Sequence, residues 1–266
     1  MNELVRAGAA IVRRDARVFF SYRLRPVREL VGTVFTVALF YELAQLVSTT
    51  EFPTPSAYFE FAAVGLALTP MLRVGLVAPP AALREELLTG TFERLALSPL
   101  GASACLLATL AFPLAIGMAS GAVILALAGT VFGLGLAWPS ALLAPGVAIL
   151  TALALAPFGA LLLAAGMLAK QASAGSGWIV AGLALLGGVY FPPDLLPDWI
   201  NWGAEVQPVT PALDLLRHVL TGSDIGAPLP AVAKLAAFAL IGLPLAAGML
   251  GAAVSRARRR GTLLEY

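Results

Sequence analysis

Long stretches without a single charged side chain constrain this chain more than any other feature of its sequence. No Asp, Glu, Lys or Arg occurs between Arg94 and Lys170, between Lys170 and Asp194, or between Lys234 and Arg256. A helix needs about 20 apolar residues to cross a bilayer, so these stretches have room for two, one and one. The chain is only 12% charged, whereas a soluble domain is about 25% charged. The sequence therefore predicts an integral membrane protein.

Six apolar segments are predicted to span the bilayer, which gives an all-α fold with one transmembrane domain over residues 1–266. Prolines inside them are compatible with helices packed in a membrane bundle. Glycines spaced four apart at Gly117 and Gly121, and at Gly129 and Gly133, permit close helix contact without identifying the partner. The expected spans are Leu30–Ser48, Ala57–Pro79, Ser103–Ala128, Ser140–Leu168, Ser176–Phe191 and Pro230–Ala253.

The first 29 residues are basic and do not have the pattern of a cleavable signal, which would place its apolar stretch directly after a basic start. Instead, apolar residues recur at helical spacing opposite arginines. This pattern favours an amphipathic helix in the cytoplasmic headgroup layer over a basic tail that only fixes topology. The apolar positions are Leu4, Ile11, Val12, Phe19 and Tyr22, and the arginines are Arg6, Arg13 and Arg17.

The distribution of basic residues predicts the orientation. With six spans, both termini lie on one side of the membrane. That side carries seven arginines before Leu30, three basic residues in its loops (Arg84, Arg94 and Lys170) and four arginines after the last span. The opposite side carries only Arg217 in its connections. By the positive-inside rule both termini are cytoplasmic, in a multi-pass protein of the cell (inner) membrane.

Two connections are unusual. The cytoplasmic one, residues 81–100, interleaves leucines and charges at near-helical spacing, which predicts a short amphipathic helix at the membrane surface whose polar face docks a soluble partner. The external one, residues 192–229, is neither a full span nor an ordinary polar loop. Its tryptophans suit the interfacial aromatic belt. We expect two short helices re-entering the outer leaflet, covered by protein.

Both connections resemble those of the ABC-2 type permease family of ABC exporters. The cytoplasmic one is similar to the family's acidic, glycine-threonine coupling segment, and the external one to its Gly-x-x-Phe-Pro, Leu-Pro-x-Trp, Pro-x-Thr and Leu-Asp-x-x-Arg pattern. The coupling residues are Glu85, Glu86, Gly90, Thr91, Glu93, Arg94, Leu95, Ser98 and Pro99. The external residues are Gly188, Phe191, Pro192, Leu196, Pro197, Trp199, Pro208, Thr210, Leu213, Asp214 and Arg217.

The resemblance implies a dimer of permease subunits, identical copies or paralogues, driven by two cytosolic ABC ATPase subunits. The chain itself has no GxxxxGK[S/T] phosphate loop. We therefore expect it to bind no cofactor and to be a transport subunit without its own ATPase. ATP and Mg would be held by the partner, and its closure would move the coupling segment.

A few polar residues in or near the spans are candidates for lining the pathway. Arg73 either lines it or snorkels to the cytoplasmic headgroups, because an arginine at the bilayer centre costs about 2.5–3.5 kcal/mol. Glu42 and Gln45 either line an outer vestibule or mark its polar rim. Asp214 and Arg217, three apart in a predicted helix, are expected to form a local ion pair. His218, the single histidine, lacks the convergent partners of a metal site.

The predicted function is outward transport of a drug-like or lipid amphiphile, with membrane lipids as surroundings and no role for nucleic acid. A lipid-linked polysaccharide exporter is the alternative, and a stand-alone channel or scaffold is a further one. A membrane-embedded serine hydrolase is excluded, because Ser176 and His218 are predicted at opposite faces of a bilayer about 30 Å thick.

Overall fold

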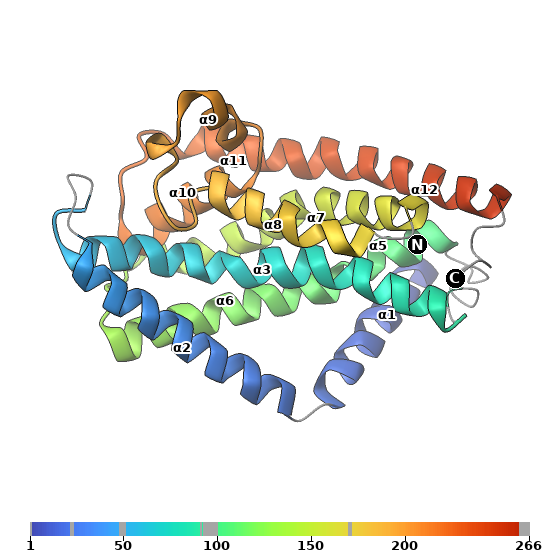
Figure 1. Cartoon of the computed structure of the whole chain (residues 1–266), viewed down its shortest axis with the longest axis horizontal. Coiled ribbons are helices and arrows are strands. Elements are labelled where there is room, and N and C mark those ends of the chain that lie inside the picture. The colour runs from blue at the N-terminus through green and yellow to red at the C-terminus, as the bar shows by residue number, and fades with distance from the viewer. Residues whose placement is uncertain are drawn as a thin grey trace.

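The computed structural model describes residues 2–21, 24–47, 52–90, 92, 101–169 and 172–260, and these form a bundle of helices (Figure 1). In its N-terminal half the helices are α1 (Asn2–Ser21), α2 (Leu24–Leu46), α3 (Pro55–Leu88), α5 (Ala102–Ala108) and α6 (Ala111–Phe132). The C-terminal half has η1 (Ser140–Leu143), α7 (Ala144–Ala169), α8 (Ala172–Leu186), η2 (Pro193–Leu195), α9 (Asp198–Glu205), α10 (Val209–Thr221), α11 (Pro228–Ala237), η3 (Phe238–Gly242) and α12 (Leu243–Arg260).

Helix α3 is the centre of the bundle, packed by α6, α7, α8 and the C-terminal half of α2 (Figure 1). Its closest neighbour is α6, and small residues bring the two backbones together. A Cβ atom on Gly117 would lie 2.6 Å from the Cα atom of Met71, and one on Gly121 would overlap the carbonyl of Ala67. The first pair of spaced glycines is therefore a true helix contact. Gly129 and Gly133 have no such close neighbour.

The second predicted span ends too early. We expected it to stop at Pro79 and a separate surface helix to follow, but α3 continues through Pro79 and Pro80 as one helix of 34 residues to Leu88. Both prolines are buried, and a proline inside a helix is tolerated where neighbouring helices cover the freed backbone groups. Residues 83–88 are therefore the end of α3, and they do not form a helix of their own.

Within the part of the chain that the structure describes, five helical segments are long and apolar enough to cross a membrane: Val27–Leu46, Pro55–Leu88, Ala102–Phe132, Ser140–Leu168 and Pro228–Arg259. They correspond to five of the six predicted spans. The third consists of two helices, α5 and α6, with a break at Thr109 and Leu110. The remaining segment, predicted as Ser176–Phe191, forms the shorter helix α8 of 15 residues, about 22 Å long. It ends before Gly187 and Gly188, and Gly188 has a positive φ of 80°.

Helices α1 and α2 form a V (Figure 1), and α1 stays in contact with the bundle through Phe19, whose ring lies 5.7 Å from that of Phe112 in α6. The start of α1 and the C-terminal ends of α3 and α12 lie at the same end of the long axis, whereas α9 and α10 lie toward the opposite end. The predicted interfacial segment 1–29 thus comprises α1 and the first turn of α2. The end of the molecule that gathers α1, the end of α3 and the end of α12 is called the coupling end below.

Candidate functional site

The C-terminal end of α3 presents the first two of the predicted coupling residues, Glu85 and Glu86. Glu85 is exposed and Glu86 half-buried. The helix ends where the Thr89 N–H donates to the Glu85 carbonyl at 2.9 Å and Gly90 takes a φ of 71°. A positive φ at this position favours glycine. A Cβ atom on Gly90 would meet nothing within 4 Å, so the described neighbours leave room there and only the backbone turn requires glycine.

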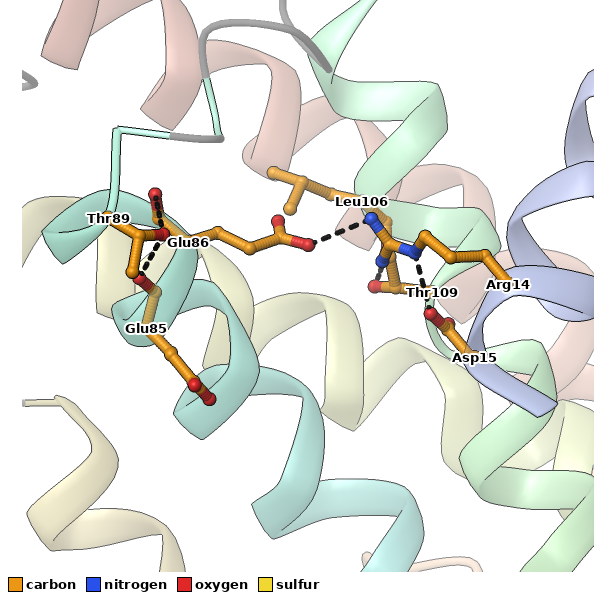
Figure 2. A network of polar contacts seen from close by, with 7 residues as sticks. All are labelled: Arg14, Asp15, Glu85, Glu86, Thr89, Leu106 and Thr109. Atoms are coloured by element: carbon orange, nitrogen blue, oxygen red, sulfur yellow. Dashed lines mark hydrogen bonds and ion pairs between the residues drawn. The ribbon is translucent and has the colours of Figure 1, made fainter. Parts of the chain in front are cut away.

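Glu86 is held by a contact from α1 that the sequence did not predict. Arg14 Nη1 lies 3.1 Å from Glu86 Oε1, and Arg14 Nε donates to Asp15 at 2.9 Å. Figure 2 shows Glu86 extending toward Arg14 while Glu85 points away. Burial lowers the pKa of Arg14, but the two carboxylates Asp15 and Glu86 outweigh it, so this pKa lies above its ordinary value. The N-terminal helix is therefore tied by charge to the coupling segment.

The rest of the predicted coupling segment, Thr91, Glu93, Arg94, Leu95, Ser98 and Pro99, lies outside the described residues. Phe92 is described and is 2% exposed, so the segment returns a large apolar side chain to the core two residues after the exposed turn at Thr89 and Gly90. In the described part of the segment, the Glu85 carboxylate is available to a partner, whereas the Glu86 carboxylate already pairs with Arg14.

The external pattern forms a compact cap of η2, α9 and α10, so two short α-helices occur where two were predicted. Pro192, Pro197 and Pro208 each immediately precede one of these three elements. The Thr210 hydroxyl donates to the Ala204 carbonyl at 2.8 Å and so ties α10 to α9. Trp199 is 76% exposed, as expected of a side chain in a membrane interface, and Phe191 is half-buried.

Arg217 fastens this cap to the bundle. Its side chain is buried, and Nη2 donates to the Gly188 carbonyl at 2.7 Å and to the Phe61 carbonyl at 3.3 Å. The guanidinium also lies 3.5 Å from the centre of the Phe61 ring, a cation–π contact. Burial lowers the pKa of Arg217 to about 10, against the opposing effect of the Asp214 carboxylate. One side chain thus joins α10, the turn after α8 and the N-terminal part of α3.

The predicted ion pair between Asp214 and Arg217 is wrong. Among the described residues, the ion pairs within 4.0 Å do not include these two side chains. The reason is that Arg217 turns inward, to carbonyl groups from two other segments, while Asp214 remains half-buried. Sequence spacing indicates which side chains can meet along one helix, but it does not show the carbonyl groups that another element supplies.

The three candidates for lining the pathway are exposed side chains on two helices. Glu42 and Gln45 are exposed in the last turns of α2, and Arg73 is exposed on α3. For Arg73, the continuation of α3 past Pro79 to Leu88 puts the side chain farther from the end of its helix than the sequence predicted.

A match to a family model identifies the protein family to which the chain belongs. The model of the ABC-2 type transporter family matches residues 10–221. The chain belongs to the ABC-2 type transporter family. It is a multi-pass membrane protein and the permease component of an ABC transporter, the part that works with separate ABC ATPase subunits. Among curated proteins, no sequence matches this chain.

Proposed function

We propose that this ABC-2 permease exports an amphiphile from the cytoplasm or inner leaflet, driven by two cytosolic ATPase subunits that bind at the coupling end. The permease acts as a dimer, formed with a second copy or a paralogue, in the inner membrane. Both termini are cytoplasmic. This orientation agrees with the basic residues exposed at the coupling end, Arg13, Arg17, Arg256 and Arg259.

The observation that carries the proposal is the continuity of α3. One helix bears Glu85 and Glu86 at one end and, 24 residues earlier, Phe61, whose carbonyl and ring hold Arg217. This separation is about 36 Å along the helix axis, which is comparable to the thickness of a bilayer. A displacement of the coupling end is therefore transmitted along a packed helix to the external cap, as coupling between distant sites requires.

The contact between α1 and α3 would transmit the same movement to a second helix, α1. Because Arg14 holds Glu86, a push on the end of α3 also displaces α1, and with it the first arm of the V. Glu85, which points away from Arg14 (Figure 2), is the carboxylate available to a basic group on the ATPase. Opposite charges across an interface set partner choice more than overall affinity, so reversing this one charge is a sharp test.

The test is native mass spectrometry of the affinity-purified chain, taken from its own cell in mild detergent. We compare the unchanged chain with Glu85→Lys and with the matched control Glu205→Lys, which makes the same change on exposed Glu205 of the external cap. We expect two permease copies with two ATPase subunits, and a loss of bound ATPase of roughly tenfold for Glu85→Lys alone, as one unfavourable charge contact of about 1.4 kcal/mol produces.

A second pair of variants tests the turn. Gly90→Asn tolerates a positive φ better than Gly90→Val does, so only the valine variant should lose the ATPase. A complex that contains no ATPase and does not respond to any of these variants would refute the coupling proposal and favour a stand-alone channel or scaffold.

A further inference from the structure

Arg73 lies near the middle of the membrane-spanning part of α3. The only charged residues that flank it on this helix are Glu60, 13 positions before, and Arg84, 11 positions after. These separations are about 20 Å and about 16 Å along the axis. The span that seemed to end six residues after Arg73 in fact continues to the turn at Gly90. Uncharged helix therefore extends about 20 Å on one side of the arginine and about 16 Å on the other, as expected of a position inside the bilayer.

Geometry also disfavours snorkelling toward the cytoplasm. Side chains of an α-helix tilt toward its N-terminus, and the N-terminal end of α3 is the end that bears the external cap. Arg73 therefore leans away from the nearer, cytoplasmic headgroups, and about 16 Å exceeds the reach of its side chain. An ionisable side chain at this depth almost always faces protein or a water-filled path.

The structure leaves Arg73 open on one face of α3. Its side chain is exposed, and no ion pair joins it to another described residue. Helix α2 covers the outer part of α3 through Val37 and Ala44, which are fully buried. Toward its N-terminus α2 diverges from α3 (Figure 1) and exposes apolar side chains such as Val31 and Phe35. Leu66 of α3 belongs to the same buried cluster as Val37 and Ala44, and Arg73 follows it by seven positions, which is two helical turns along the same face of α3.

We propose that Arg73 binds the acidic headgroup of the transported molecule, so that the substrate class is an anionic amphiphile. The proposal rests on the proposed export function. A guanidinium pairs with phosphate or carboxylate through two parallel hydrogen bonds, and the attraction is strong where water is scarce. The apolar tail would lie against the exposed surfaces of α2 and α3. A neutral or cationic amphiphile would leave the arginine without a counter-charge.

The experiment uses the co-purified complex with its ATPase in proteoliposomes. Two fluorescent lipids with identical labelled chains are compared, one with a phosphatidic acid headgroup and one with phosphocholine, and ATP-dependent movement is followed by dithionite quenching. Variants are Arg73→Gln, Arg73→Lys and the control Arg256→Gln, which removes an exposed arginine near the C-terminal end of α12. ATPase content and basal ATP hydrolysis are measured on every preparation.

We expect the anionic lipid to move at least about fivefold faster than the zwitterionic one, as a charged hydrogen-bonded pair predicts. Arg73→Gln should abolish this preference while keeping the ATPase and its basal activity. Arg73→Lys should retain most of it, and Arg256→Gln all of it. Added inorganic phosphate should not compete, because it lacks the tail.

Different failures have different meanings. If the complex hydrolyses ATP but moves both lipids equally, or if Arg73→Gln slows both equally, the anionic substrate class is wrong and the export function stands. Inhibition by inorganic phosphate would reassign the site to a soluble anion and overturn the amphiphile. If no ATPase co-purifies with the unchanged chain, the proposed function itself fails.

Discussion

The contact between α3 and α6 predicts opposite outcomes for the same substitution at two positions of one helix. Gly117 and Gly129 both lie in α6. A new Cβ atom on Gly117 would lie 2.6 Å from Met71 Cα, 3.0 Å from Met71 N and 3.2 Å from Pro70 O. On Gly129 its nearest neighbour would be the Leu134 carbonyl at 3.7 Å, an ordinary contact.

The magnitude follows from these distances. Carbon atoms pack best at about 3.5–4.0 Å, so Gly117→Ala requires the two helices to separate by about 1 Å. The obstructing atoms are main chain and cannot rotate away. Overpacking of this kind costs about 1–3 kcal/mol, whereas Gly→Ala within a helix gains about 0.5–1 kcal/mol. We expect Gly117→Ala to destabilise the protein by about 1–2 kcal/mol and Gly129→Ala to stabilise it by about 0.5–1 kcal/mol.

The assay is unfolding in detergent micelles, followed by the loss of monodisperse protein on size-exclusion chromatography after heating. Met71→Ala should not rescue Gly117→Ala, because the clash is with backbone atoms. In contrast, Gly75→Ala meets the end of the Leu114 side chain at 2.6 Å, so Leu114→Val should relieve it. Equal stability of the Gly117 and Gly129 variants, or rescue by Met71→Ala, would refute this packing of α3 on α6.

Three further predictions concern the charged contacts. Arg14→Glu and Glu86→Arg should each destabilise the α1–α3 contact, and the double swap should restore it. Because Arg14 is partly exposed to solvent, the coupling energy in a double-mutant cycle should be about 0.5–1 kcal/mol. Additive effects of the two substitutions would mean that the pair does not form in solution. Arg217→Lys should cost about 1–3 kcal/mol in thermal stability, because one ammonium group cannot serve two carbonyls and stack on Phe61, and Phe61→Leu should cost less. Burial raises the pKa of the Asp214 carboxyl above its ordinary value of 3.8, so the stabilisation from the protonated form is complete below pH 3.8 and is lost as the pH rises through the raised pKa. Asp214→Asn should abolish this pH dependence of the melting temperature. An unchanged pH dependence in the variant would mean that another group causes it.

Much of the coupling end and the external cap could be anticipated from local patterns. Prolines and glycines at Pro192, Pro197, Pro208 and Gly90 mark the starts and ends of elements by their own backbone restrictions. The predicted end of the second span at Pro79 failed, because the same restriction is overridden where neighbouring helices bury the proline. Local rules do not include those neighbours.

The sequence by itself determined that this protein is a helical membrane protein of the ABC-2 family. The length of the uncharged stretches and the order of the motifs along the chain are enough for that conclusion, and neither depends on tertiary contacts. Tertiary structure alone decided which groups meet. Arg14 pairs with Glu86, which is more than 70 residues away in the sequence, and Arg217 donates hydrogen bonds to the carbonyls of Phe61 and Gly188 and does not pair with the nearby Asp214. A buried donor binds whatever acceptor the packed helices bring within reach, and that choice depends on helices distant in sequence.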